Sequence, residues 1–151
     1  MFFLLDIKNE KQRKEICENI LGKLPKWFDI DKNIVTYKEE VKNGEFFTLY
    51  DDEKPVGFIN IKFNNEYTAK IHLLGILEEY KGKGLENKIF ENIEKIIKGK
   101  SYKFLMVKIL GLSNEDPTYK NNVEFYKNIG FYSLEETLGR KNPCIIMIKP
   151  L

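Results

Sequence analysis

Cysteine and histidine are scarce in this sequence, which holds two cysteines and one histidine among 151 residues. Cys17 and Cys144 lie far apart and form no CxxC pair or Cys/His cluster, so the sequence supports neither a zinc site nor a disulfide framework. We therefore expect two free thiols in a reducing compartment and no bound metal.

Long hydrophobic runs are also missing. Met1 to Leu5 is apolar, but Asp6 and Lys8 follow at once. This stretch is too short for a signal peptide or a membrane span, and no cleavage site follows it. We therefore predict a cytoplasmic protein without a membrane partner.

Neither sign of charge dominates, because 25 Lys and Arg residues stand against 23 Asp and Glu residues, a net charge of +2. Such a balance gives no overall attraction to a polyanion, and no basic face with interleaved aromatics is present, so a nucleic-acid partner is not expected. The basic residues gather locally: residues 81–108 hold eight lysines and three glutamates. Eleven Phe, eight Tyr and 42% hydrophobic residues exclude a disordered chain.

The length predicts one domain over residues 1–151, because the five prolines are scattered and no repeat, low-complexity tract or Pro/Gly/Ser linker interrupts the sequence. Apolar periodicity and turn residues predict seven strands and four helices. The strands are expected at Phe2–Lys8, Phe46–Tyr50, Val56–Phe63, Ala69–Leu77, Tyr102–Leu110, Phe131–Leu138 and Cys144–Ile148, and the helices at Glu10–Leu24, Lys32–Lys42, Leu85–Ile97 and Thr118–Ile129. Hairpins and crossovers in this order indicate a mixed sheet with helices on its faces.

The strand, turn and helix over residues 69–97 form the first informative unit. Gly82 and Gly84 allow close approach of the backbone to a ligand, and the following helix begins with unpaired amides, so a phosphate group fits there. Lys81 and Lys83 add positive charge. Two glycines before a helix also occur in plain turns, and that interpretation stays open.

The second unit is a helix that ends in the sequence FYKNIGF, residues 125–131. Tyr126 lies four residues before Gly130. A helical tyrosine more often packs in a core than acts in chemistry, but here the two units occur in order with one strand between them.

Together these units resemble the GNAT superfamily of acetyl-CoA-dependent N-acetyltransferases, and one bacterial subgroup in particular. The family has Gln or Arg, two residues, Gly, one residue, and then Gly or Ala at the start of its central helix; residues 81–86 read KGKGLE, and residues 125–131 match the second family motif without a gap. Five further segments carry the subgroup resemblance, so that nearly the whole chain is covered: residues 24–28, 54–59, 66–69, 102–105 and 142–147. The resemblance implies an α+β fold of the three-layer α/β type, with a mixed central sheet of about seven strands, about four flanking helices and splayed central strands.

The sequence departs from the family pattern at three positions. Lys81 keeps the positive charge of the usual Arg or Gln, whereas Glu86 places a carboxylate where Gly or Ala is usual, beside the expected diphosphate. Tyr119 stands where many members have Asn. A non-catalytic acyl-CoA-binding or regulatory domain is therefore the alternative to an acetyltransferase.

The resemblance also implies the site residues and a direct transfer from acetyl-CoA, as co-substrate, to a primary amine of a small molecule, peptide or protein. Tyr126 is expected to protonate the departing thiolate. Ile76 is expected to donate its backbone amide to the pantetheine arm. The expected cofactor-binding residues are Leu74, Gly75, Ile76, Lys81, Gly82, Lys83, Gly84, Leu85, Glu86, Tyr119, Asn122 and Tyr126.

The catalytic base and the acceptor site are less defined. His72 is the only histidine and lies just before the cofactor turn, and imidazole is the side chain best suited to exchange protons at physiological pH, so His72 is a candidate base, with Glu66, water and a purely structural histidine as alternatives. Trp27 and Phe28 are expected to line the acceptor pocket or to pack in the core. Cys144 to Ile148 is a candidate dimer element or an ordinary last strand.

Overall fold

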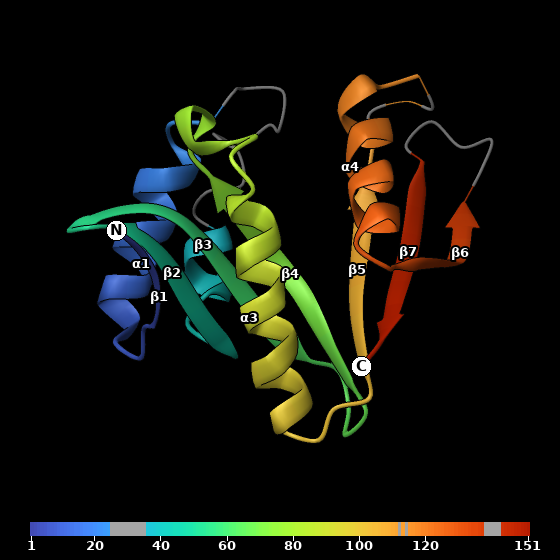
Figure 1. The fold of residues 1–151 in the computed structure, drawn as a ribbon, viewed down its shortest axis with the longest axis horizontal. Helices are drawn as coiled ribbons and strands as arrows, with labels where there is room; N and C mark the ends of the chain where they lie inside the picture. Colours follow the sequence, from blue (N-terminus) through green and yellow to red (C-terminus); the bar gives the residue numbers. More distant parts are fainter. Residues whose placement is uncertain (25–35, 112, 114, 138–142) are drawn as a thin grey trace. The chain divides into compact units, whose positions relative to one another are not determined.

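The computed structural model describes residues 1–24, 36–111, 113, 115–137 and 143–151 (Figure 1). One mixed sheet of seven strands has the order β1-β2-β3-β4-β5-β7-β6. The strands are β1 (Phe2–Asp6), β2 (Glu45–Asp51), β3 (Lys54–Phe63), β4 (Thr68–Ile76), β5 (Phe104–Leu110), β6 (Tyr132–Thr137) and β7 (Cys144–Pro150). The helices are α1 (Glu10–Leu21), α3 (Leu85–Gly99), α4 (Pro117–Asn128) and the single turn η2 (Glu78–Tyr80), and residues 36–40 are also helical.

The predicted fold class and the order of elements are confirmed, and the differences lie at element ends. The first helix stops at Leu21, because Gly22 caps it through a bond from its amide to the Glu18 carbonyl. The fifth strand begins at Phe104 instead of Tyr102, after Ser101 at a φ of 73°. The predicted helix Lys32–Lys42 lies partly outside the described residues.

The chain divides into two compact units, Met1–Lys62 with His72–Asn92 and Phe63–Ile71 with Ile93–Leu151. In the first unit, β1, β2 and β3 form an antiparallel meander. Helix α1 is amphipathic, and its buried residues Ile16, Cys17 and Ile20 cover this sheet. The stacked rings of Phe46 and Phe58, 5.1 Å apart, lie in the same core.

The buried side chain of Arg13 links α1 to two other segments of the first unit. The guanidinium of Arg13, on α1, donates to the carbonyls of Ile7 at 2.7 Å, Val41 at 3.1 Å and Gly44 at 3.1 Å. Nζ of Lys62 donates to the carbonyls of Glu40 and Asn43. These carbonyls end the helical residues 36–40, and a positive charge is favourable at a helix C-terminus. The network therefore fixes this short helix against α1 and β3.

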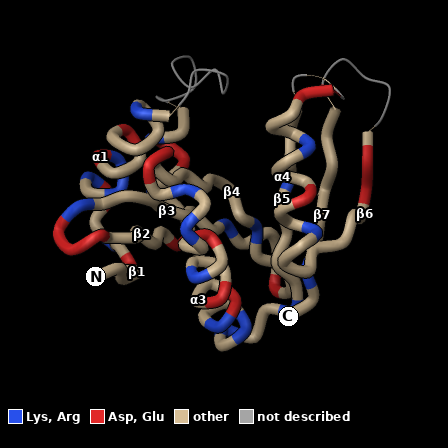
Figure 2. The backbone as a smooth tube through the Cα atoms, turned by 45° about the horizontal axis from the view of Figure 1, so that its top comes forward, with Lys and Arg blue, Asp and Glu red and all other residues tan. Residues whose placement is uncertain are grey.

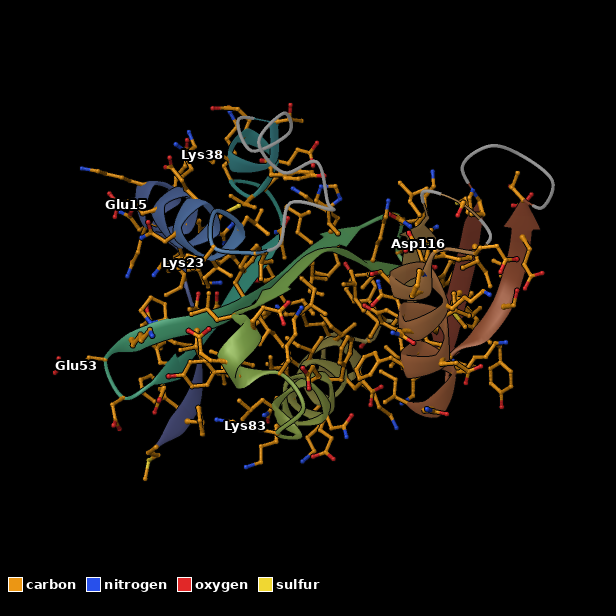
Figure 3. The ribbon with its side chains drawn as sticks, turned by 90° about the horizontal axis from the view of Figure 1, so that it is seen from above. Glu15, Lys23, Lys38, Glu53, Lys83 and Asp116 are labelled. Carbon is orange, nitrogen blue, oxygen red and sulfur yellow. The ribbon has the colours of Figure 1, made fainter. Side chains whose placement is uncertain are left out.

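In the second unit, β4 pairs in parallel with β5 over Thr68–Ile71 and Phe104–Val107, and β7 pairs antiparallel with β5 and with β6. Helix α4 contacts β5 (Figure 1). Asp116, labelled at the start of α4 in Figure 3, caps the helix by accepting a hydrogen bond from the Thr118 amide at 3.0 Å, and Pro117 follows in the first turn. None of the helices in the described residues has the length and apolar character of a membrane span.

Candidate active site

The glycine-containing turn after β4 has the backbone geometry that the sequence predicts. Gly82 and Gly84 have φ values of 77° and 75°, which side-chain-bearing residues rarely adopt. A Cβ atom added at either position would meet nothing within 4 Å. The two glycines are therefore required by backbone conformation, and the space in front of them is open for a ligand.

The segment before these glycines is tied down on both sides. The amide of Leu77 donates to the Val56 carbonyl on β3 at 2.9 Å. The hydroxyl of Tyr80 donates to Oδ2 of Asp51, at the end of β2, at 2.9 Å. This bond and burial raise the pKa of Tyr80 above its ordinary value. These two hydrogen bonds fix the backbone of residues 77–80, directly before Gly82.

Positive charge gathers around the ring of Tyr80. The ammonium groups of Lys54 and Lys83 lie 5.6 Å and 5.4 Å from its centroid. Lys83, labelled in Figure 3, lies beside the N-terminal end of α3. Lys81 is exposed and pairs with Glu78 at 3.1 Å. Three lysines and three glutamates balance each other along α3, which carries both charge colours in Figure 2, so the helix itself adds no net charge.

Leu85 and Glu86 are the first two residues of α3, and their side chains differ in burial. Leu85 is buried with 2% exposure, whereas Glu86 is half-buried in the same turn. Their backbone amides belong to the group that an α-helix leaves without intrahelical partners. An anion at this helix end would meet the positive end of the helix dipole.

The predicted residues on β4 lie directly before this turn. Ile76 is buried, and Leu74 is half-buried. A Cβ atom at Gly75 would lie 3.0 Å from the Phe58 ring and 3.2 Å from Ile20, so glycine lets α1 pack closely against the strand. Gly75 therefore has a packing role in addition to the cofactor contact predicted for it.

His72, on the same strand, contacts Glu40 through its Nε2 and the carboxylate Oε2. With the ring proton on Nε2, the imidazole donates to Glu40, and Nδ1 presents a lone pair. Glu40 could not be predicted from the sequence as a partner of His72, because the two residues are 32 positions apart and no motif links them. Glu66 is exposed in the turn before β4.

In the second unit, Tyr119, Asn122 and Tyr126 follow each other at helical spacing on α4. The ring of Tyr119 lies over Gly111, where a Cβ atom would be 2.7 Å from Cγ, and burial raises its pKa. Asn122 is half-buried. The three predicted residues therefore share one side of the helix.

Tyr126 is buried with 6% exposure, and desolvation raises the pKa of its phenol above the ordinary value of 10.0. Its ring packs edge-on against Phe125 at 5.3 Å and Phe131 at 5.1 Å. The Phe131 amide donates to the Tyr126 carbonyl at 2.9 Å, and Gly130 ends the helix at a φ of 102°. The motif of residues 125–131 is thus a helix terminus that buries the phenol among aromatic rings.

Comparison with known proteins decides the family. The family model described as the Acetyltransferase (GNAT) family matches residues 11–131. The chain belongs to the GNAT acetyltransferase family. No curated protein matches its sequence.

Solved structures of other GNAT proteins have the same fold. The PaiA N-acetyltransferase from Thermoplasma acidophilum, in complex with coenzyme A, has a TM-score of 0.76, 21% identity and 99% coverage of both chains. The aminoglycoside 6′-N-acetyltransferase from Enterococcus faecium has a TM-score of 0.74, 16% identity, and coverage of 98% of this chain and 96% of the other. The ribosomal-protein-S18-alanine N-acetyltransferase from Escherichia coli has a TM-score of 0.72, 17% identity, and coverage of 98% and 94%. At these identities the likeness establishes the GNAT fold.

Trp27 and Phe28, the predicted acceptor-site residues, lie outside the described residues. The other predicted site residues fall into two groups, one on β4 and the turn of the first unit, the other on α4 of the second unit. Sequence reasoning missed Tyr80, Asp51 and Glu40. Only Tyr80 carried a signal, as an aromatic residue directly before the basic turn.

Proposed function

We propose that the protein transfers the acetyl group of acetyl-CoA directly to a primary amine of a small molecule, a peptide or a protein. The observation that carries this proposal is the turn of residues 81–84, where two glycines of positive φ open onto the N-terminal end of α3. Membership in the GNAT family and the coenzyme A complex of a structural neighbour support the choice of cofactor.

The turn and the first turn of α3 are proposed to bind the diphosphate of coenzyme A. Backbone amides of Gly84, Leu85 and Glu86 would donate to the phosphate oxygens. Lys81 and Lys83 would add charge from exposed positions, where the attraction is screened by salt. No metal is needed for this mode of binding, because amides and lysines supply the donors.

The pantetheine arm is proposed to run along β4 at Leu74, Gly75 and Ile76, with the Ile76 amide as donor. Tyr119 and Asn122 are proposed to contact the cofactor from α4. These assignments rest on the family resemblance and on the sharing of one helix side by Tyr119, Asn122 and Tyr126.

In the proposed reaction, the amine nitrogen attacks the thioester carbonyl, the C–N bond forms, and the C–S bond then breaks. Tyr126 is proposed as the general acid, whose phenol gives its proton to the departing thiolate. Its burial supports this role, because a phenol with a raised pKa stays protonated at neutral pH and is able to donate.

His72 is proposed as the base that removes the proton from the attacking nitrogen. The contact with Glu40 supports this role, because it fixes the ring and leaves Nδ1 for the proton. Glu40 would act as a positioning residue. Water and Glu66 remain the competing bases, and His72→Gln distinguishes them from the imidazole.

The acceptor class is the broadest part of the proposal. Two structural neighbours act, by their names, on an aminoglycoside and on the alanine of ribosomal protein S18, so the same fold serves small and protein amines. Trp27 and Phe28 stay the predicted acceptor-site residues. A cytoplasmic location also stays a prediction, and so does a homodimer through Cys144–Ile148.

A non-catalytic acyl-CoA-binding or regulatory domain is the second candidate, and Glu86 is the observation that favours it. Its carboxylate lies in the first turn of α3, where it would repel a diphosphate while stabilising the free helix.

Calorimetry with acetyl-CoA, followed by thiol-release assays against a panel of amines, separates the two functions. Binding with thiol release on at least one amine supports the enzyme. Binding without release on any amine favours the second function, and the absence of binding contradicts both. Glu86→Ala measures the repulsion, since it should tighten binding.

A further inference from the structure

A lysine on β7 holds the C-terminal end of α4. Nζ of Lys149 donates to the carbonyl of Ile129, the C-cap residue of α4, at 2.6 Å. A positive charge is favourable at a helix C-terminus, where the last carbonyl groups lack intrahelical partners. Lys149 therefore caps α4, although it lies 20 positions later in the sequence.

Backbone hydrogen bonds of a local turn hold the same end of the helix. The Gly130 amide donates to the Lys127 carbonyl at 3.1 Å, and the Phe131 amide donates to the Tyr126 carbonyl at 2.9 Å. Lys149 adds a donor from another strand. The end of the helix that carries Tyr126 is thus held by its own turn and by β7.

The side chain of Lys149 lies against Gly130. A Cβ atom added to this glycine would be 3.1 Å from Cε and 3.4 Å from Nζ of the lysine. Its φ of 102° is also one that side-chain-bearing residues rarely adopt. Gly130 thus leaves room for the ammonium to reach the Ile129 carbonyl.

Glu94, on α3, holds the same ammonium by a second contact. Its Oε1 is buried and lies 2.5 Å from Nζ of Lys149, and the two side chains are 23% and 24% exposed. Salt screens such a partly buried pair less than it screens an exposed one. The pair of Lys120 and Glu115 near the start of α4 is of the exposed kind, with side chains 55% and 88% exposed.

The aromatic neighbours of Tyr126 do not fix it to the rest of the second unit. Phe125 and Phe131, which pack against its ring, belong to the same segment and would move with it. Lys149 and Glu94 belong to β7 and α3, and all of these residues lie in the second unit. Their contacts therefore add to the packing of α4 on β5.

We propose that Lys149 and Glu94 are positioning residues for the phenol of Tyr126. This proposal rests on the proposed role of Tyr126 as general acid. Tyr126 lies three residues before Ile129, so less than one helical turn joins the carbonyl that Lys149 holds to the backbone that carries the phenol. An acid must lie within hydrogen-bond reach of the atom that it protonates, so a fixed helix end favours the transfer.

Kinetics in two backgrounds test the proposal. Lys149→Met keeps an unbranched side chain over Gly130 and removes the ammonium. It should lower kcat about 10- to 100-fold and leave the KM for acetyl-CoA unchanged, because a misplaced catalytic group slows the chemical step. In the Tyr126→Phe background the same substitution should leave kcat almost unchanged, since the acid is already absent. Equal losses in both backgrounds would overturn the proposal.

Lys127→Met is the matched control, because it removes an exposed lysine from the last turn of the same helix. It should leave kcat unchanged, and a loss equal to that of Lys149→Met would contradict the proposal. Circular dichroism melts check that the variants are folded. If Lys149→Met is unfolded, Lys149→Met with Glu94→Gln replaces it, because this variant leaves no carboxylate without its partner.

Nuclear magnetic resonance of protein with ¹³C-labelled tyrosine rings gives a readout independent of turnover. The signals of Tyr126 are those that Tyr126→Phe removes. Lys149→Met should shift or broaden them and leave the signals of Tyr50, in the first unit, unchanged. Unchanged Tyr126 signals would overturn the proposal at any level of activity. Equal kcat in Tyr126→Phe and wild type would instead refute the proposed acid, and the Tyr126 signals would still decide whether Lys149 positions the ring.

Discussion

The side chain of His72, on β4, contacts the carboxylate of Glu40, 32 residues earlier in the helical residues 36–40. Lys62 and Arg13 hold the carbonyls at the end of this short helix, so the carboxylate is fixed relative to the strand. The pair lies wholly in the first unit, on the strand that continues into the glycine turn.

Changes to this pair should affect turnover more than cofactor binding. His72→Gln should reduce kcat about 10²- to 10⁴-fold, the usual contribution of a general base, while leaving the dissociation constant of acetyl-CoA unchanged. Glu40→Ala should cost about 10- to 100-fold through loss of orientation. Glu40→Gln keeps a hydrogen-bond acceptor and should recover most of the rate. An unchanged kcat in His72→Gln would remove histidine from the mechanism and leave water or Glu66.

The buried phenol of Tyr126 should matter for the chemical step alone. Tyr126→Phe keeps the packing against Phe125 and Phe131 but removes the proton donor, so kcat should fall about 10²- to 10⁴-fold with little change in the KM for acetyl-CoA. Because burial raises the pKa of the phenol, its ionisation should not lower the wild-type rate between pH 7 and about pH 10. Steady-state kinetics of both proteins over this range provide the check, and equal kcat values would refute the assignment.

The glycine turn offers a matched pair of substitutions. Gly84→Ala forces a side chain into a φ of 75°, a strain of about 1–2 kcal/mol, and should weaken acetyl-CoA binding measured by calorimetry. Gly99→Ala, at the end of the same helix, also meets nothing within 4 Å but carries no positive φ. It should leave the dissociation constant unchanged. Equal affinity of the two variants would mean that the turn does not bind the cofactor.

The order of elements could be predicted because each depends on a local pattern. Local sequence patterns predict the helices. Examples are the apolar repeat of α3, the Asp116-Pro117 pair at the start of α4 and Gly130 at its end. The contact of Glu40 with His72 and the tie of Tyr80 to Asp51 join residues that only the tertiary fold brings together. No pattern along the sequence encodes such pairs, so the site could be predicted at its motifs and not at its supporting residues.

The buried thiol of Cys17 should make stability fall at high pH. Burial raises its pKa from 9.0 to about 12, so the unfolded chain loses this proton first as the pH rises. The contribution of Cys17 to the free energy of unfolding is complete below pH 9 and decreases between pH 9 and 12. Urea unfolding at pH 8 and pH 10 should show a smaller loss in Cys17→Ala than in the wild type.

Cys144→Ala is the control for this measurement, because Cys144 is only half-buried. It should lose stability between the two pH values as the wild-type protein does. Cys17→Ala itself should cost about 1 kcal/mol at pH 8, since removal of the sulfur leaves a cavity in the core. If all three proteins lost the same stability, Cys17 would not be the source of the pH dependence.

The central claim is acetyl transfer from acetyl-CoA to a primary amine, and mass spectrometry of the reaction products tests it most directly. Purified protein is incubated with acetyl-CoA and a panel of small-molecule and peptide amines, with Tyr126→Phe in parallel. The expected result is an amine that gains one acetyl group while an equal amount of free coenzyme A appears, at a much lower rate in the variant. Acetyl-CoA that binds but leaves every amine unmodified would contradict the account.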